Sequence, residues 1–339
     1  MFDPKRFLSV NLDNTFKTII HTLEYDFSTV TADIDCQNYE KFISSSLKML
    51  TDKSTFFTNY PSTNGLLELR ELITKKRFNN NIDPDKIWLT NGASGAFSLL
   101  CDIFLRPHDT VLVESYCYHG FLAELHRRKI NVIHIDSDDK GISPEAIKKC
   151  VIHLKKNKIF PKFIHLMPTL QNPTGQSLPL ERRLQLLDVI QEIGMIIIEN
   201  DSYADFSFGH QPLLPSLYEL SDNDNIIYIS SYTKLLGCSI RVGFLSSKAI
   251  FKPVINQMIY GRTPCQLSTI CTYSYLKESY DEVVKKTAFI LKKKRDTMID
   301  SIDLYFDQSI TYNIPDGGMF LWIKLPEKID INKLLSLSL

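Results

Sequence analysis

Short apolar runs rich in β-branched residues alternate along this chain with stretches of helical periodicity. The apolar runs predict seven strands, at residues 86–90, 110–114, 131–135, 162–167, 195–200, 225–230 and 241–246. Helices are predicted between them, at residues 93–105, 118–128, 143–156 and 179–193. Strands that alternate with helices predict an α/β protein with a mostly parallel, seven-stranded sheet between helices.

Polar segments that contain glycine follow several of these predicted strands. Ligands of a parallel sheet bind beyond the carboxyl ends of its strands, so these segments are the first place to expect a site. Glycine is scarce in the chain, with 13 in 339 residues, yet Gly92, Gly175, Gly237 and Gly243 all fall in such segments. This clustering indicates close approach of the backbone to a ligand, or positive φ angles.

Composition and charge narrow the function classes. Acidic and basic residues number 39 each, so no charge excess points to nucleic acid or to a membrane surface. No apolar run is long enough to span a bilayer, and the first residues lack the apolar stretch of a secretory signal. The seven cysteines form no Cys-x-x-Cys pair, and the histidines lack metal-ligand spacing. These features favour free thiols in the cytoplasm and no metal site.

The segment 230–244 carries the most specific chemistry in the chain. It places Ser231, Lys234 and Arg241 just after an apolar strand. A lysine amine forms a Schiff base with an aldehyde, while a hydroxyl and a guanidinium hold a phosphate. Pyridoxal 5'-phosphate is a phosphorylated aldehyde, so the segment predicts this cofactor.

Three further segments supply groups suited to the same cofactor. The backbone N–H groups of Ala93 and Ser94, at the start of a predicted helix, form an anion site. Asn172 precedes a proline, which holds it extended and presents its amide to a phenolate oxygen. Asp201, at the end of an apolar strand, would keep a pyridine nitrogen protonated, and Tyr203 would donate to the ring oxygen.

Tyr118, after the strand at 110–114, offers a ring that can stack on a flat cofactor. Each of these segments, taken alone, is also compatible with an ordinary turn, helix cap or strand end. A nicotinamide dehydrogenase is disfavoured because the chain has no Gly-x-Gly-x-x-Gly fingerprint.

The order and spacing of the segments resemble the class I/II aminotransferases of pyridoxal phosphate fold type I, the aspartate aminotransferase superfamily. In that family Asn-Pro-(Thr/His)-Gly lies about thirty residues before Asp-x-(Ala/Pro/Ser)-Tyr, which precedes Ser-x-(Ser/Thr)-Lys and Arg-x-Gly. Here Asn172, Asp201, Lys234 and Arg241 are separated by 29, 33 and 7 residues. The resemblance runs from about residue 60 to about residue 325.

The resemblance implies transamination between an amino acid and a 2-oxo acid. In it, Lys234 forms the internal aldimine and later moves the proton between the substrate α-carbon and the cofactor. Asp201 pairs with the pyridinium nitrogen, Asn172 and Tyr203 bond the ring hydroxyl oxygen, and Tyr118 stacks on the ring. The residues to which it assigns a catalytic role are thus Lys234, Tyr203 and Asp201.

The same resemblance implies how the cofactor phosphate is held. The backbone around Ala93 and Ser94 contacts it, together with Ser231 and Arg241. Tyr60 matches the family tyrosine that reaches the phosphate from the partner subunit. A homodimer with composite sites is therefore expected.

Two domains are also expected from the resemblance, a large cofactor-binding domain at 46–285 and a small domain at 1–45 plus 286–339. The substrate loop near the N-terminus, residues 28–33, keeps only Asp33 of the family pattern. Residues 316–326 match the family's small-domain strand. The strands that follow it, and the arginine that grips the substrate α-carboxylate, have no counterpart before Leu339. This predicts a truncated C-terminus and an exposed strand edge at 320–325.

Two alternatives to transamination stay open. One is a catalytically impaired protein, or a truncated gene product, that keeps the cofactor without a grip on the substrate. The other is a pyridoxal phosphate-dependent lyase or synthase on the same fold, which shares every cofactor residue. The sequence does not select the amino donor or the oxo acid acceptor.

Overall fold

The computed structural model describes residues 30–31, 34–52, 58–209, 214–331 and 333–334. A seven-stranded sheet lies at the centre of the fold, in the order β1-β9-β8-β7-β6-β2-β3. Its strands are β1 (Ile87–Thr90), β2 (Thr110–Glu114), β3 (Asn131–Ile135), β6 (Phe163–Leu166), β7 (Ile196–Asn200), β8 (Ile226–Ser231) and β9 (Gly243–Ser247). β9 is antiparallel to both of its neighbours, and the other pairs are parallel. The predicted mostly parallel, seven-stranded sheet is confirmed.

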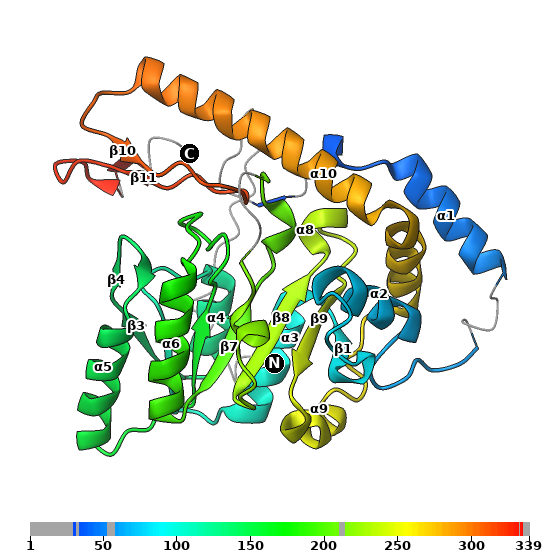
Figure 1. Cartoon of the computed structure of the whole chain (residues 1–339), viewed down its shortest axis with the longest axis horizontal. Helices are drawn as coiled ribbons and strands as arrows, with labels where there is room; N and C mark the ends of the chain where they lie inside the picture. The colour runs from blue at the N-terminus through cyan, green and yellow to red at the C-terminus, as the bar shows by residue number, and fades with distance from the viewer. Residues whose placement is uncertain (1–29, 32–33, 53–57, 210–213, 332, 335–339) are drawn as a thin grey trace, which may run out of the picture.

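Helices pack on both faces of this sheet (Figure 1). They are α1 (Tyr39–Asp52), α2 (Leu67–Arg77), α3 (Gly92–Phe104), α4 (His119–Arg127), α5 (Pro144–Lys156), α6 (Leu180–Ile193), α7 (Leu217–Leu220), α8 (Thr233–Leu236), α9 (Lys252–Met258) and α10 (Gln266–Tyr305). Local sequence explains several of their ends. At the start of α5 the Ser143 hydroxyl accepts a hydrogen bond from the Ala146 N–H at 3.2 Å. α6 ends at Gly194, whose φ of 73° is the left-handed conformation that terminates helices.

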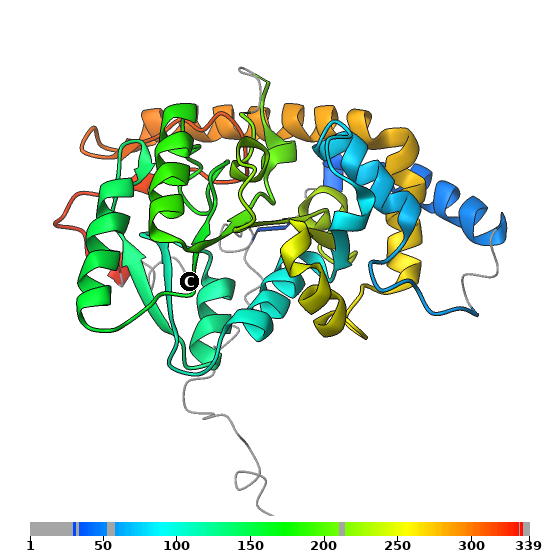
Figure 2. The same cartoon turned by 60° about the horizontal axis from the view of Figure 1, so that its bottom comes forward.

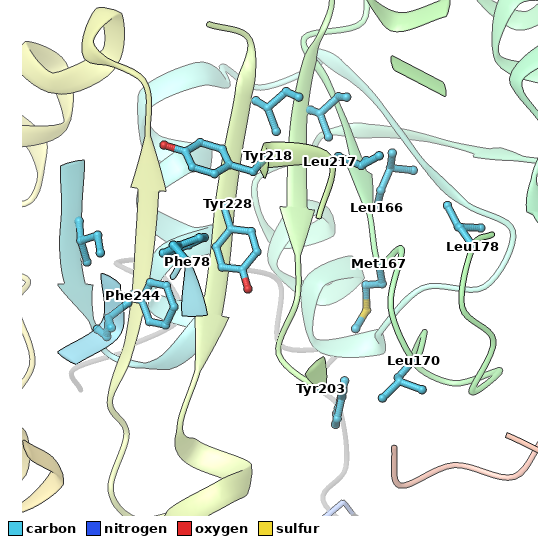
Figure 3. Close-up of a cluster of buried hydrophobic side chains, with 14 of the residues drawn as sticks. Phe78, Leu166, Met167, Leu170, Leu178, Tyr203, Leu217, Tyr218, Tyr228 and Phe244 are labelled. Atoms are coloured by element: carbon cyan, nitrogen blue, oxygen red, sulfur yellow. The ribbon is translucent and has the colours of Figure 1, made fainter. Parts of the chain in front are cut away.

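Two hydrophobic clusters cover the two faces of the sheet. On one face, helices α2, α5, α6 and α10 pack over Tyr228, Phe244 and the aliphatic residues beside them. Figure 3 shows Phe78 with these two rings, and the Phe78 and Tyr228 ring centroids are 5.2 Å apart. On the other face, α3, α4 and α9 pack over the sheet, and Phe97 stacks on Phe121 with centroids 4.2 Å apart. Because both faces are covered, the strands read as continuous apolar runs in the sequence.

The 40-residue helix α10 crosses the molecule beyond the sheet, and both views show that it bends between its first part and its longer second part (Figures 1 and 2). α1 packs along its first half, where Lys41 pairs with Glu282 at 2.9 Å. The domain boundary expected at residue 285 falls inside this helix, and the division into two domains stays a prediction. None of the helices that the structure describes is both long enough and apolar enough to cross a bilayer.

Two short hairpins complete the described fold. They are formed by β4 (Ser137–Asp138) with β5 (Gly141–Ile142), and by β10 (Thr311–Tyr312) with β11 (Ile323–Lys324). The strand expected at 320–325 is thus limited to two residues, and it pairs with β10 on one edge. Gly317 also bridges to Ser207, which ties this C-terminal segment to the loop after β7.

Candidate active site

A cavity of about 590 Å³ lies at the carboxyl ends of the central strands. Eight of the ten predicted site residues line it: Ala93, Ser94, Tyr118, Asn172, Tyr203, Ser231, Lys234 and Arg241. The structure thus gathers segments that are up to 148 positions apart in the sequence. Tyr60 and Asp201 are not among the lining residues. Nine residues that the sequence interpretation did not select also line the cavity: Val30, His119, Phe121, Met167, Pro173, Asn200, Ser202, Thr233 and Phe320.

One end of the cavity is built to hold an anion. Helix α3 begins at Gly92, directly after β1, so its first N–H groups and its positive dipole end face this side. The Thr233 N–H donates to the Ser231 hydroxyl at 3.1 Å, and Arg241 donates to the Asn91 carbonyl at 3.2 Å. Hydroxyls, a guanidinium and a helix N-terminus therefore converge on one position.

Gly92 is needed at this end for a steric reason. Its φ is +70°, and a Cβ atom there would lie 3.1 Å from the Arg241 guanidinium and 3.2 Å from the Thr233 hydroxyl. A side chain would thus press on both of the groups that surround the anion position. The absence of a Cβ atom keeps that space open.

A second part of the cavity wall carries a buried pair of polar groups. The Asn172 side-chain N–H donates to the Tyr203 hydroxyl at 3.3 Å, and both residues are buried. Burial raises the pKa of the Tyr203 phenol, so the hydroxyl stays a proton donor at neutral pH. The Phe320 ring meets the Tyr203 ring edge-on, with centroids 5.4 Å apart. This arrangement suits an oxygen atom on a flat ring.

Two buried ionisable side chains, Arg183 and Glu114, form hydrogen bonds that hold the loop carrying Asn172. The Arg183 guanidinium donates to the carbonyls of Leu178 and Pro168, at 3.0 and 2.9 Å. The Glu114 carboxyl accepts the Met167 N–H at 2.8 Å, and burial raises the pKa of Glu114 to about 7. These contacts fix both ends of the loop, which positions the Asn172 amide at the cavity.

Tyr118 lies at the start of α4 with its ring half-buried at the cavity. A Cβ atom at Gly120 would fall 2.5 Å from this ring, so glycine two residues later makes the room that the ring occupies. The Tyr118 ring also meets the Phe121 ring edge-on, with centroids 5.4 Å apart. The ring is therefore braced where a flat ligand could stack on it.

Lys234 lies in the single turn of α8, just beyond β8. Its Nζ donates a hydrogen bond to the Val30 carbonyl and lies 3.9 Å from the Cys238 sulfur. Residue 30 thus brings a piece of the N-terminal segment over the lysine. Of the substrate loop expected at 28–33, Asp33 lies outside the described residues.

Asp201 does not line the cavity, and this differs from the sequence-based expectation. Its Oδ2 accepts a hydrogen bond from the Tyr228 hydroxyl at 2.9 Å, on the face of the sheet covered by α2 and α10. Burial raises the pKa of Asp201, while Arg77, paired with Asp205 at 2.9 Å, acts in the opposite direction. The structure therefore does not bring this carboxylate to a ring in the cavity.

Asn200 lines the cavity in its place. Side chains alternate between the faces of a strand, so neighbours at the end of β7 point to opposite sides. The signal was present in the sequence. The motif Asp-x-(Ala/Pro/Ser)-Tyr has its acid three positions before the tyrosine, and three positions before Tyr203 stands Asn200.

Tyr60 is fully exposed and lines a separate surface hollow of about 330 Å³ with Thr263 and Pro264. It does not reach the cavity of its own chain.

The "Aminotransferase class I and II" family model matches residues 36–336. The chain belongs to this family. A 2-aminoadipate transaminase of Thermus thermophilus is 26% identical over 309 residues, covering 88% of this chain and 75% of that protein. The mitochondrial kynurenine/alpha-aminoadipate aminotransferase of Rattus norvegicus is 29% identical over 259 residues, covering 73% of this chain and 61% of the relative.

Solved structures agree with this assignment. An alpha-aminoadipate aminotransferase from Thermus thermophilus, in complex with N-(5'-phosphopyridoxyl)-L-leucine, superposes with a TM-score of 0.83 and 25% identity, covering 91% of this chain and 79% of the other. A multiple substrate aminotransferase from Thermococcus profundus shares the fold, with a TM-score of 0.84, 23% identity and coverage of 91% and 78%. The protein is thus a fold type I aminotransferase whose cofactor is pyridoxal 5'-phosphate. The comparisons give no support to the lyase or the impaired-protein alternative.

Proposed function

We propose that this aminotransferase binds pyridoxal phosphate in the 590 Å³ cavity, with the phosphate at the α3 end and the ring between Tyr118 and the sheet. The observation that carries the proposal is the convergence of an anion cradle, a buried amide–phenol pair and one lysine on a single cavity. When bound, the cofactor supplies a reactive aldehyde and a ring that withdraws electrons from the substrate α-carbon.

The residues at the anion end hold and orient the ligand. Arg241 and the N–H groups of Ala93 and Ser94 bind the phosphate, and Ser231 adds a hydroxyl. Charge-assisted hydrogen bonds of this kind are short and strong, so they fix the ring at a defined distance from Lys234.

The other residues act on protons. Asn172 and Tyr203 donate hydrogen bonds to the ring oxygen, for which the protonated Tyr203 phenol is suited. Lys234 would hold the cofactor through its Nζ, and its free, neutral amine would take the proton from the substrate α-carbon. The Val30 segment and Phe320 lie at the cavity and reduce its access to water.

The proposal includes a homodimer. A fully exposed tyrosine beside a surface hollow, absent from the cavity of its own chain, suits a residue that serves the site of a second subunit. A cytoplasmic location is also proposed, and the seven free cysteines support it.

The test is the visible absorption spectrum of the cofactor-loaded protein, before and after a mixture of amino acids is added. We expect a visible band that bleaches as the amino group is transferred. Borohydride should fix the cofactor to the wild-type protein and to a Lys248→Ala control, whose lysine lies over the Tyr218 ring away from the cavity. Lys234→Ala should bind the cofactor more weakly and yield no fixed adduct. A fixed adduct in Lys234→Ala would refute the assignment.

A further inference from the structure

At the end of β7 the cavity is lined by the side-chain amide of Asn200, at a position where the family motif has a carboxylate. Asn200 is the last residue of β7 and is only 4% exposed. The Ser202 hydroxyl donates a hydrogen bond to its Oδ1 at 2.6 Å. This bond occupies the carbonyl end of the amide and fixes the orientation of the side chain. Its other end, the Nδ2 donor, makes no hydrogen bond within the described part of the chain.

The nearest acids do not substitute for the missing carboxylate. Asp201 is bonded to Tyr228, and Asp205 is bonded to Arg77 and to the Tyr280 hydroxyl at 2.6 Å. Glu199 accepts the N–H groups of Leu217 and Tyr218, both at 2.8 Å. None of these three acids lines the cavity. At the end of β7, the Asn200 amide thus lines the cavity, and the neighbouring acids are bonded outside it.

We propose that the Asn200 side-chain N–H is the hydrogen-bond partner of the pyridine nitrogen of the cofactor, and that it keeps this nitrogen unprotonated. The inference rests on the proposed binding mode. An N–H donor needs a lone pair to donate to, which a pyridine nitrogen has and a pyridinium lacks. An amide also carries no charge that would stabilise a pyridinium, as a carboxylate does.

This difference bears directly on the reaction. A protonated ring draws electrons from the substrate α-carbon more strongly than a neutral ring does. The chain therefore binds its cofactor in an electronically weaker form. Proton removal by Lys234 is expected to be slower than the same cavity would support with an acid at this position.

The experiment is a ¹⁵N NMR spectrum of the protein loaded with cofactor that is ¹⁵N-labelled at the ring nitrogen, at pH 7.5. Free labelled cofactor, recorded in acid and in base, gives the reference shifts of the protonated and unprotonated ring. We expect the wild-type shift to match the unprotonated reference and the Asn200→Asp shift to move to the protonated one. Asn200→Asp should also speed the amino acid half-reaction by about tenfold, because a protonated ring withdraws electrons from the substrate α-carbon more strongly than a neutral one.

Asp201→Asn is the matched control, since it removes the neighbouring acid and leaves Asn200 in place. Its ring shift should equal that of the wild type. A protonated wild-type ring would overturn the inference, whether or not Asn200→Asp folds, and so would a ring shift that responds to Asp201→Asn alone. Failure of the proposed function is distinguishable, because the wild type would then give no borohydride-fixed adduct.

Discussion

Asn200 and Asp201 are neighbours in the chain, yet Asn200 lines the cofactor cavity while Asp201 is bonded to Tyr228 on the other face of the sheet. The alternation of side chains along a strand produces this separation. If the partner of the cofactor ring is chosen by chemical type, Asp201 is selected. If it is chosen by position along the strand, Asn200 is selected. A shift of one residue along β7 therefore decides whether an amide or a carboxylate faces the cofactor ring.

Tyr60 offers a direct test of the composite site. Tyr60→Ala and Lys234→Ala are each expected to lose most activity as pure proteins. In mixed dimers, one of the two sites regains both the lysine and the partner's tyrosine. Activity should therefore return when the two variants are unfolded together and refolded as a mixture, measured as turnover against each variant alone.

If mixing restores nothing while sedimentation shows a dimer, Tyr60 does not act across an interface. A monomer in sedimentation would remove the dimer itself from the proposal.

Arg241 combines a functional guanidinium with an unfavourable backbone conformation, since its φ is 53°. Loss of a charged hydrogen-bond partner costs about 1.5–3 kcal/mol, so Arg241→Ala and Arg241→Gly should both weaken cofactor binding by roughly 10- to 100-fold. Glycine tolerates this φ, so Arg241→Gly alone should raise the free energy of unfolding of the cofactor-free protein relative to Arg241→Ala, by about 1 kcal/mol. Fluorescence titration and urea unfolding measure the two effects. Unchanged cofactor affinity in both variants would exclude Arg241 from the phosphate site.

His165 should make stability depend on pH. Burial lowers the pKa of His165 to about 3, beneath its ordinary value of 6.5. Below about pH 6.5 the His165 imidazole binds a proton in the unfolded chain but stays neutral in the folded chain. The free energy of unfolding therefore decreases as the pH falls. The loss approaches about 1.4 kcal/mol per pH unit for one proton.

The measurement is urea unfolding of the wild type and of His165→Leu between pH 7 and pH 5. The difference between the two proteins isolates this histidine from the buried acids, whose effect is common to both. The exposed His153→Leu serves as the control for loss of a histidine as such. Parallel curves for wild type and His165→Leu would contradict the assignment.

Phe97, on helix α3, packs its ring toward the sheet. Its ring is 1% exposed and lies against Phe121, Phe163 and His165. Phe97→Ala should lower the free energy of unfolding by about 3–5 kcal/mol, through lost burial and the cavity left behind. Phe289→Ala is the matched control because Phe289 is 71% exposed, and a change within about 0.5 kcal/mol is expected there. Equal losses in the two variants would mean that the α3 face is not packed as described.

The sequence predicted the sheet well because each strand is an apolar run buried on two faces, and such runs are visible without tertiary information. The cavity residues at strand ends followed from the same logic, and eight of them do meet. Asp201 was selected for its chemistry, without regard to its position relative to Tyr203, and it does not line the cavity. Val30 and Phe320 could not be predicted, since they reach the cavity through contacts between distant segments.

The buried acids have an electrophoretic consequence. Burial raises the pKa of Glu199 to about 8 and that of Glu114 to about 7, so both hold protons part of the time at pH 7. The formal charge of zero assumes that all 39 acids are ionised. At pH 7 the native protein should therefore carry more positive charge at these two sites than the denatured chain does. In isoelectric focusing the contribution of these two acids should move the native protein to a higher pH than the same chain in urea. Denaturation in an unbuffered solution near pH 7.5 should release protons from both acids, which a pH electrode detects.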